Sequence, residues 1–486
     1  MKQTLLFLGL LGFAGTVQAQ VSGLGPWVEV NTTNFATKPP GYIIRDIKTV
    51  APNVAWAVTE EGSQTGLPTT FIKTKNAAGT EFSFGNITAV GASADFEASN
   101  ISSTDAAGLV AVAAKFPSIQ NVTGGEILRT TNGGQTWTKV TTATQFAPGQ
   151  DGYCNWVHMF NDAEGVALGD PTNNAWEILR TTDGGATWTR LTTNIPAPLA
   201  GEFGWVRSFF ARGNTIWAGT GANSGTSRVR VLKSTDKGLT WTASPVTSLT
   251  GFIDRLAFKD ELNGIAFNTK VNSARTAISE VNLIRTADGG ATWAPITQVN
   301  APAGSFFYED IDAVDGRYYS VGARFPAVAP FQAADLGASF STDGINWTQI
   351  SSEFGFTTLD VISGASPGIT TGYAGFVTEA SGAGGIFKAN SVVTATRNAA
   401  LQGVLRAYPN PSHSGVFQVE TGAYLTGSAQ LTVVDAMGRQ VRTQALRATA
   451  VGSKGISLDL SGEKTGVYTL QIRTAAGIAT QKLVLN

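Results

Sequence analysis

The chain has 486 residues, and its 34 basic and 35 acidic residues nearly cancel. Charged residues make up only 14% of the sequence, which argues against nucleic-acid binding and against binding to a charged membrane surface. The 56 glycines and many short apolar runs favour an all-β protein rich in turns, with room for more than one domain. A single cysteine, Cys154, excludes an intramolecular disulfide, and two distant histidines argue against a zinc site. We therefore expect no cofactor and no bound metal.

Residues 1–19 are predicted to be a secretory signal peptide. Lys2 precedes an apolar run at residues 5–13, and Val17 and Ala19 are small residues at the usual cleavage positions. No later run reaches the roughly 18 apolar residues that a membrane-spanning helix needs. The mature protein is therefore expected to be secreted or attached to the cell surface, without a transmembrane segment.

An octapeptide that ends in tryptophan recurs along the chain. It reads TTNGGQTW at residues 130–137, TTDGGATW at 181–188, STDKGLTW at 234–241 and TADGGATW at 286–293. A copy one residue short lies at 341–347, and a degenerate copy lies at 74–82. The closing aromatic residues are separated by 55, 51, 53, 52 and 54 residues. A nearly constant period of this size is typical of a solenoid, a propeller or an array.

The octapeptide is predicted to be a tight turn between two strands. Its Asp or Asn can hydrogen-bond backbone groups two residues on, its glycine supplies a positive φ, and its tryptophan buries a large ring. A short apolar run precedes each copy and an alternating run follows it, which predicts strand, turn and strand. The residues expected to have this structural role are Asn132, Trp137, Asp183, Trp188, Asp236, Trp241, Asp288, Trp293, Asp343 and Trp347.

These octapeptides resemble the Asp-box, or BNR repeat, of sialidases, other secreted glycoside hydrolases, sortilin-type receptors and a photosystem assembly-factor family. The resemblance implies a β-propeller in which the box is a structural turn, so its aspartates are not catalytic candidates. A second strand pair lies between successive boxes, as at residues 157–160 and 166–168. Each period of roughly 50 residues therefore holds four strands, the content of one propeller blade.

The ends of the repeat region predict seven blades over residues 25–395. The strand that precedes each box recurs at residues 386–389 with no box after it. Residues 27–30 look like the strand that follows a box, but no blade precedes them. The N-terminal strand would then complete the last blade and close the ring, which removes exposed strand edges. Six blades and a separate hairpin are the alternative.

Residues 396–404 are predicted to be a linker, and residues 405–486 a small Ig-like β-sandwich of short alternating strands. The second segment is similar to the C-terminal sorting domain of type IX (Por system) secretion cargo in Bacteroidetes. It carries Y-P-N-P at 408–411, D-x-x-G-R at 435–439 and a Lys-bearing final strand, but has Glu463 where that family usually has leucine. The resemblance implies two partners, the type IX translocon and its sortase, with release or attachment at the outer-membrane surface. An ordinary adhesive sandwich domain is the alternative.

A ligand site is expected on the propeller face opposite the boxes, where the loops that enter the innermost strands lie. The candidates there are Arg45, Asp46, Trp156, Trp205, Arg207, Asp254, Arg255, Glu309 and Asp310. Strand alternation predicts that Arg45, Arg207 and Arg255 project to the same side, where three guanidiniums would bind a carboxylate or sulfate. Sialidases bind their substrate carboxylate with an arginine triad, but their Arg-Ile-Pro signature is missing here. Alternatively, these arginines pair with nearby acids and join the blades.

The sequence is compatible with two functions. The first is a non-enzymatic, monomeric secreted propeller that binds a glycan, a peptide or an envelope component at its loop-rich face. The alternative is a glycoside hydrolase of sialidase-like or xyloglucanase-like type, which needs two carboxyl groups about 5–10 Å apart. The carboxyl groups that could supply this pair are those of Asp46, Asp170, Glu202, Asp254, Glu309 and Asp310. Spacing along the chain selects no pair among them.

Overall fold

The computed structural model describes residues 24, 27–30, 42–61, 70–117, 123–147, 152–273, 277–297, 306–325, 333–352, 354–363, 370–376, 385–390, 399–421, 429–435, 439–446, 455–474 and 477–486. The predicted signal peptide lies outside these residues, and the predicted linker is described from residue 399 onwards. Strands and turns dominate the part described, where the helical elements are α1 (Ala399–Val404), at the end of the predicted linker, and a 3-10 turn (Ala333–Asp335). The described residues divide into two compact units, a larger one within residues 24–390 and a smaller one within residues 399–486.

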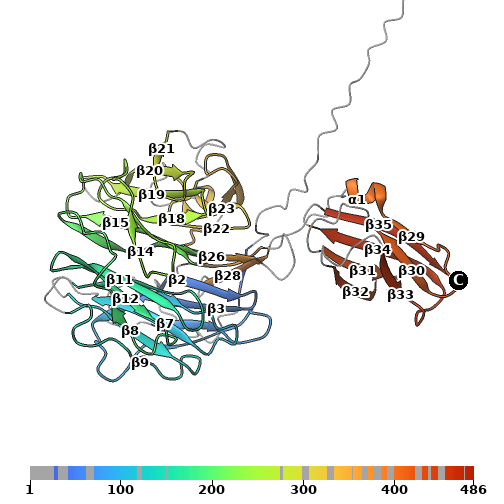
Figure 1. The fold of residues 1–486 in the computed structure, drawn as a ribbon, viewed down its shortest axis with the longest axis horizontal. Coiled ribbons are helices and arrows are strands. Elements are labelled where there is room, and N and C mark those ends of the chain that lie inside the picture. Colours follow the sequence, from blue (N-terminus) through green and yellow to red (C-terminus); the bar gives the residue numbers. More distant parts are fainter. Residues whose placement is uncertain are drawn as a thin grey trace, which may run out of the picture. The chain divides into compact units, whose positions relative to one another are not determined.

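Among the residues that the structure describes, the larger unit contains seven antiparallel sheets of four strands each, named here sheets 1 to 7. Many of their strands are labelled in Figure 1. Sheet 1 is β2 (Tyr42–Ala51), β3 (Val54–Glu61), β4 (Thr70–Thr74) and β5 (Phe82–Asn86); sheet 2 is β6 (Phe96–Ser102), β7 (Ala111–Pro117), β8 (Glu126–Thr130) and β9 (Thr138–Lys139). Sheet 3 is β10 (Cys154–Met159), β11 (Gly165–Thr172), β12 (Ala175–Thr181) and β13 (Thr189–Arg190); sheet 4 is β14 (Glu202–Arg212), β15 (Thr215–Ala222), β16 (Val231–Ser234) and β17 (Thr242–Ala243). Sheet 5 is β18 (Arg255–Phe258), β19 (Gly264–Val271), β20 (Ile278–Thr286) and β21 (Ala294–Ile296); sheet 6 is β22 (Asp310–Val314), β23 (Arg317–Ala323), β24 (Leu336–Ser341) and β25 (Trp347–Ser352). Sheet 7 is β26 (Thr358–Ser363), β27 (Thr370–Gly375), β28 (Ile386–Asn390) and β1 (Val28–Glu29).

The first strands of successive sheets contact one another in a closed cycle. β2 contacts β6, and the cycle continues through β10, β14, β18, β22 and β26, which in turn contacts β2. The strand β1 comes from the start of the chain and pairs with β28 near its end, with Val28 opposite Lys388 and Glu29 opposite Phe387. This cyclic arrangement of four-stranded sheets is typical of β-propellers.

Side chains satisfy the open edges of several innermost strands. An innermost strand pairs on one side only, so part of its backbone amides need other acceptors. The acceptor comes repeatedly from the first strand of the preceding sheet, at distances of 2.5–3.1 Å: Asp46 for Ile101 N, Asn100 for Val157 N, Ser102 for Met159 N, Asp310 for Leu359 N, Asp312 for Val361 N and Asp360 for Thr49 N. These hydrogen bonds join neighbouring sheets around the centre.

The box octapeptides form turns closed by their own side chains. Asp288 accepts hydrogen bonds from the Thr286 hydroxyl at 2.6 Å, from the Thr292 amide at 2.9 Å and from the Thr292 hydroxyl at 2.5 Å. Gly290 in the same turn has a φ of 88°, which favours glycine. Asp183 and Asp236 accept the corresponding three hydrogen bonds from the hydroxyl and amide groups of their own turns. The indole N–H groups of Trp188, Trp241 and Trp347 donate to a glycine carbonyl within their own turns.

Acid is expected to weaken these turns. The Thr286 and Thr292 hydrogen bonds lower the pKa of Asp288 from 3.8 to about 2. Because this pKa is lower in the folded state than in the unfolded state, the stabilisation is complete above pH 3.8 and is lost as the pH falls through about 2. We expect the melting temperature, followed by circular dichroism, to fall over this range. Asp288→Ala should cost about 1 kcal/mol at neutral pH and reduce the acid response, whereas Asp288→Asn should cost less because it keeps an acceptor. An equal acid response in the alanine variant would contradict this account.

The smaller unit has two sheets around one apolar core. β29 (Arg406–Tyr408), β30 (Val416–Glu420) and β33 (Ile456–Asp459) form a three-stranded sheet. The second sheet has the order β32 (Gln440–Leu446), β31 (Ala429–Val434), β34 (Gly466–Thr474) and β35 (Gly477–Leu485). Phe417, Leu431 and Leu483 from both sheets are fully buried in one cluster. The unit therefore has a core of its own, while its likeness to an Ig domain stays a prediction.

Candidate functional site

A cavity of about 320 Å³ lies among the innermost strands of the larger unit. All seven first strands, from β2 to β26, contribute to its lining. Its charged and polar side chains are Asp46, Lys48, Asn100, Ser102, His158, Arg207, Arg255, Asp310, Asp312, Asp360 and Ser363. A volume of this size is at the lower end of the range of about 300–1,000 Å³ that is usual for small-molecule sites.

Two arginines and two aspartates, named here the arginine cluster, form one group in the cavity wall. Arg255 Nε lies 3.2 Å from Asp310 Oδ1, and Arg207 Nη1 lies 3.8 Å from Asp46 Oδ1. Arg255 also donates to the backbone carbonyl of Asp254 at 2.6 Å. The four side chains are 10–19% exposed, so their charges interact in a partly dehydrated environment.

Arg207 differs from Arg255 in two respects. Its φ is 59°, a left-handed conformation that is strained for a non-glycine residue, at a place where the register between β14 and β15 shifts. Its Nη1 is buried and has no hydrogen-bond partner among the described residues, because Asp46 is too distant to accept one. Burial, followed by repulsion from Arg255, lowers the pKa of Arg207 to about 10. The guanidinium is charged at neutral pH and lacks a full set of acceptors.

Asp46 can change its charge near neutral pH. Burial raises the pKa of Asp46 from 3.8 to about 6, against the opposing effects of Arg207 and the amide of Ile101. Asp310 and Asp360 add to the rise because their negative charges disfavour another carboxylate nearby. A proton on Asp46 would remove the negative charge that faces Arg207.

A second polar group lies two residues further along the same strands. Lys48 Nζ lies 2.9 Å from Asp360 Oδ1, and this ion pair joins sheet 1 to sheet 7. Burial, followed by the charge of Asp360, raises the pKa of Asp312 well above its usual range. Burial also raises the pKa of Asp360. His158 is neutral because burial, then Lys48, lowers its pKa to about 3.

Four of the residues predicted as ligand-binding candidates line this cavity: Asp46, Arg207, Arg255 and Asp310. Arg45 is not among the residues that line the cavity, although its charge still acts on Arg207, so the predicted convergence of three arginines stays a prediction. The register shifts between Ile44 and Asp46, and this β-bulge changes the alternation on which the prediction depended. The Arg45 guanidinium instead lies 3.1 Å from Glu97 and 5.1 Å from the centre of the Phe116 ring.

The other candidates lie elsewhere. Trp156 is completely buried and stacks on Phe209 of the next sheet at 4.6 Å, so it packs in the core and is closed to a ligand. Trp205 is partly exposed and stacks on Phe252 at 4.3 Å. Asp254 accepts hydrogen bonds from the Thr269 amide and hydroxyl at 2.6 and 2.8 Å. The Glu309 side chain is exposed beside the cavity residue Asp310.

The carboxyl groups considered for hydrolysis have mostly structural partners. Glu202 binds Arg230 through two hydrogen bonds of 2.8 and 2.7 Å, both residues being buried. Asp170 accepts from the Asn155 amide at 2.6 Å and from the Gly204 backbone at 2.9 Å.

Three cavity residues, Lys48, Asp312 and Asp360, were not predicted from the sequence. The alternation Asp46-x-Lys48 and Asp310-x-Asp312 on innermost strands was the available signal. It places charged side chains two residues apart on one side of a strand. On an innermost strand, that side can face the central cavity.

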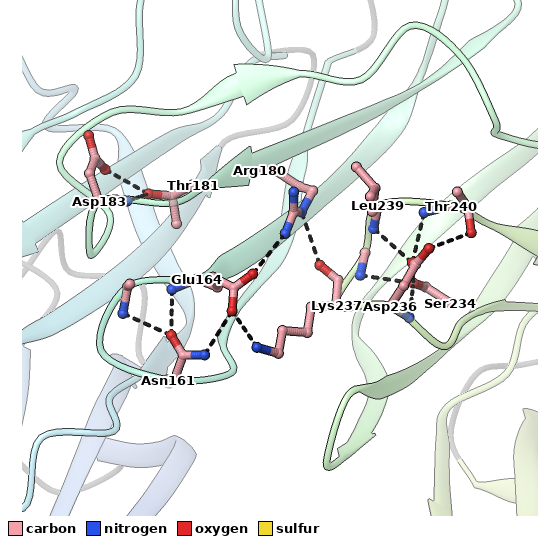
Figure 2. A network of polar contacts seen from close by, with 12 residues as sticks. Asn161, Glu164, Arg180, Thr181, Asp183, Ser234, Asp236, Lys237, Leu239 and Thr240 are labelled. Atoms are coloured by element: carbon pink, nitrogen blue, oxygen red, sulfur yellow. Dashed lines mark hydrogen bonds and ion pairs between the residues drawn. The ribbon is translucent and has the colours of Figure 1, made fainter.

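The box side of the larger unit carries a separate polar network between sheets 3 and 4 (Figure 2). Glu164 accepts hydrogen bonds from Asn161 at 3.0 Å, from Arg180 at 3.4 Å and from Lys237. Arg180 also donates to the carbonyl of Lys237 at 3.1 Å. Lys237 occupies the position that is glycine in three other boxes and has a φ of 57°. The ion pair with Glu164 thus accompanies a strained backbone.

Substitution of Lys237 should separate these two effects. Lys237→Gly removes the ion pair but relieves the positive φ, so we expect a change in unfolding free energy below about 1 kcal/mol. Lys237→Ala removes the pair and keeps the strain, and should cost about 1–2 kcal/mol. Urea unfolding of both variants measures the difference. A glycine variant less stable than the alanine variant would contradict the role given to strain.

Residues 406–486 match the family described as the secretion system C-terminal sorting domain. The smaller unit carries a type IX secretion sorting domain. The protein is therefore exported through the type IX secretion system to the cell surface or beyond, and the predicted localisation is confirmed. Within the residues described by the structure, no helix is long and apolar enough to cross a membrane.

No curated protein matches the chain, and the solved structures that resemble it include three distant ones. PorZ of Porphyromonas gingivalis, a surface component of the type IX secretion system, has 11% identity and a TM-score of 0.36. The match covers 89% of this chain and 64% of PorZ. Trypanosoma rangeli sialidase has 10% identity and a TM-score of 0.42, over 95% of this chain and 89% of the sialidase. The GH74 xyloglucanase of Xanthomonas campestris has 10% identity and a TM-score of 0.32, over 94% of this chain and 81% of the xyloglucanase. Similarities this low assign no function to the chain.

Proposed function

We propose that this protein is a secreted, seven-bladed β-propeller that binds a glycan, peptide or envelope component at its loop-rich face, in and around the central cavity. The cycle of contacts among the seven first strands supports a single ring. The pairing of β1 with β28 supports closure of that ring by the N-terminal strand. The box turns are occupied by their own hydrogen bonds, which leaves the cavity as the better candidate for ligand binding.

The observation that best supports a binding function is the buried Arg207 Nη1, which has no hydrogen-bond acceptor among the described residues. A buried donor without an acceptor is unfavourable, and so is a second arginine close to it. Both costs fall when a ligand oxygen accepts from the free Nη1. Strained backbone is frequent at functional sites, because the surrounding structure must hold it there. An arginine retained in this state is better explained by a ligand than by stability.

The sorting domain has a separate role in this proposal. It has its own core, so it can be recognised by the translocon and sortase independently of the propeller. In this proposal the smaller unit directs export, and the larger unit binds the ligand after export.

A panel of immobilised glycans and peptides tests the binding function with the purified protein. We expect at least one ligand to bind the unchanged protein and to be lost in the double variant Arg207→Met/Arg255→Met. The control Lys259→Met/Arg285→Met makes the same change of charge at the box turns of sheets 5 and 6 and should bind normally. Equal binding by both double variants, or no ligand in the whole panel, would overturn the proposal.

A glycoside hydrolase remains the second candidate because Asp312 and Asp360 both face the cavity with raised pKa values. Hydrolases of this kind pair a protonated with an ionised carboxyl group. Against it, both side chains accept hydrogen bonds from the next sheet, at 2.6 Å from Val361 N and 2.5 Å from Thr49 N. Assays of cell-wall and plant polysaccharides with Asp312→Asn/Asp360→Asn test this pair. Turnover that survives the double substitution would exclude these two carboxyls.

A further inference from the structure

A second cavity, named here the junction cavity, lies on the box side of the larger unit between sheets 2 and 3. Its volume is about 270 Å³. Sheet 2 contributes the turn between β6 and β7, and sheet 3 contributes Gly184 of its box. Among the described residues, only Ser102 lines both this cavity and the central one. The junction cavity is therefore a separate place on the molecule.

In the next junction, between sheets 3 and 4, the corresponding space is filled by an ion pair. There Glu164 accepts hydrogen bonds from Arg180 at 3.4 Å and from Lys237 (Figure 2). Gly184 has the same position in its box as Lys237 has in the following one. Val110 has the position of Glu164, because each lies two residues before the strand residue that pairs with the arginine preceding the box. Both members of the ion pair are thus replaced between sheets 2 and 3, where the cavity lies.

Arg129, the counterpart of Arg180, has no carboxylate partner among the described residues. Its Nε donates to the Gly184 carbonyl at 2.7 Å, which holds the guanidinium against the box of sheet 3. A Cβ on Gly184 would lie 3.5 Å from Arg129 Nη2, so this end of the guanidinium lies beside the place where the Lys237 side chain begins in the next junction. Arg129 is partly buried, so its charge is only partly screened by water. The cavity therefore offers a guanidinium to an anionic group.

The opposite charge comes from Asp162. Its Oδ1 accepts from the Thr104 hydroxyl at 2.7 Å, and within the described part of the chain it forms no ion pair, not even with Arg129. The third charged residue of the lining, Asp105, is already satisfied. It accepts from three backbone amides at 2.7–2.9 Å, and Lys73 lies close enough for its charge to act on it. A ligand with one positive and one negative group can therefore bridge Arg129 and Asp162.

The rest of the wall is largely apolar. It is made by Leu109, Val110, Ala111, Val112 and Met159. The Leu109 side chain is 48% exposed, so an apolar group packed against it would remove apolar surface of both partners from water. The volume lies below the range of about 300–1,000 Å³ usual for drug-sized ligands, which favours a smaller molecule. An α-amino acid with an apolar side chain has a carboxylate, an ammonium and an apolar group within one small molecule.

We propose that the junction cavity binds a free α-amino acid with an apolar side chain. The carboxylate lies at Arg129, the ammonium at Asp162, and the side chain packs against Leu109 and Met159. The ligand carboxylate then pairs with Arg129 as Glu164 pairs with Arg180 in the next junction. This inference goes beyond the proposed function, because it concerns another cavity and another class of ligand.

Isothermal titration of the full chain with L-leucine, L-methionine and L-phenylalanine tests the proposal, together with three analogues that each lack one group of leucine. 4-Methylpentanoate lacks the ammonium, 3-methylbutylamine lacks the carboxylate, and glycine lacks the apolar side chain. We expect at least one of the three amino acids to bind. For leucine, each analogue should bind about 10–100-fold more weakly, because it loses a charge-assisted hydrogen bond or the apolar contact.

Substitutions at two positions separate the contributions. Val110→Glu places a carboxylate at the position of Glu164, where it can pair with Arg129, and should weaken amino-acid binding about 10–100-fold. Val110→Gln is the uncharged control of equal size and should weaken binding less. Asp162→Asn keeps an acceptor oxygen and removes the charge, so it should weaken leucine binding and leave 4-methylpentanoate binding unchanged. If Val110→Glu does not fold, as judged by its melting curve, the Asp162→Asn comparison decides the question.

The central-cavity variant Arg207→Met/Arg255→Met separates this inference from the proposed function. It should bind amino acids as the unchanged chain does, and a loss of binding would place the ligand in the central cavity and overturn the inference. Failure of all three amino acids to bind also overturns it, as does equal binding of leucine and 4-methylpentanoate. These two results leave the proposed function intact, because the glycan and peptide panel tests that function at the other cavity.

Discussion

Replacing Trp217 with alanine is expected to destabilise the larger unit by about 3–5 kcal/mol. Trp217 on β15 is completely buried, and its ring stacks on Phe258 of β18 at 3.7 Å with an interplanar angle of 10°. Its indole N–H donates to the carbonyl of Gly289 at 2.8 Å, in the box turn of sheet 5. One side chain therefore fixes both the core and the turn of the next sheet. Its loss leaves a large cavity and an unpaired carbonyl.

Two further substitutions separate packing from hydrogen bonding. Trp217→Phe keeps most of the ring and removes the N–H, so we expect a loss of about 1–2 kcal/mol. Trp293→Phe is the matched control, because Trp293 is only partly buried and its Nε1 has no partner among the described residues. Urea unfolding monitored by circular dichroism gives the three free energies. A cost below about 1 kcal/mol for Trp217→Ala would contradict the contribution assigned to this contact.

The local structure of the repeats could be predicted because each box specifies its own turn. The hydrogen bonds of Asp183 and Asp288 lie within eight consecutive residues, so the sequence alone contains all the partners. The strand pair around a box follows from the same segment. The pairing of residues 27–30 with 386–389 could be predicted for a different reason. Each was half of a motif with its other half missing, and the structure pairs β1 with β28.

The cavity could be predicted only in part, because strand alternation fails where the strands bulge. The register shifts between Ile44 and Asp46, and Arg45 between them is not among the cavity residues. The shift after Gly204, with the positive φ of Arg207, sets the direction of that side chain. The residue types around Ile44–Asp46 and Gly204–Phe209 do not predict a β-bulge. Arg207 and Arg255 line the cavity and Arg45 does not, while a ligand-binding role for the three stays a prediction.

The second polar group was missed because its members meet only in the folded chain. Lys48 and Asp360 are 312 residues apart, and they become neighbours when sheets 1 and 7 come together. Asp312 joins them from a third sheet. Each residue taken alone reads as an ordinary polar residue of a strand. The closing of the ring, rather than any motif, creates this group and gives it perturbed pKa values.

Asp360→Ala is expected to destabilise the junction between sheets 1 and 7 by about 2–4 kcal/mol. The Asp360 carboxylate accepts from Lys48 Nζ at 2.9 Å and from the Thr49 amide at 2.5 Å. Without it, the partly buried ammonium and the amide both lose an acceptor. Asp360→Asn should cost less, since its amide oxygen still accepts from Thr49. Equal losses for the two variants would show that the charge of Asp360 is immaterial.

Asp312 should limit this loss. The charge of Asp360 contributes, after burial, to the raised pKa of Asp312, so its removal should lower that pKa and favour a negative charge on Asp312 near Lys48. Asp312→Asn alone should cost less than Asp360→Ala, because the asparagine keeps an oxygen that can accept from the Val361 amide. The double variant Asp360→Ala/Asp312→Asn should then lose about 1–2 kcal/mol more than the sum of the single variants. Urea unfolding of the four proteins completes the cycle. Simple additivity would mean that Asp312 does not compensate Lys48 for the loss of Asp360.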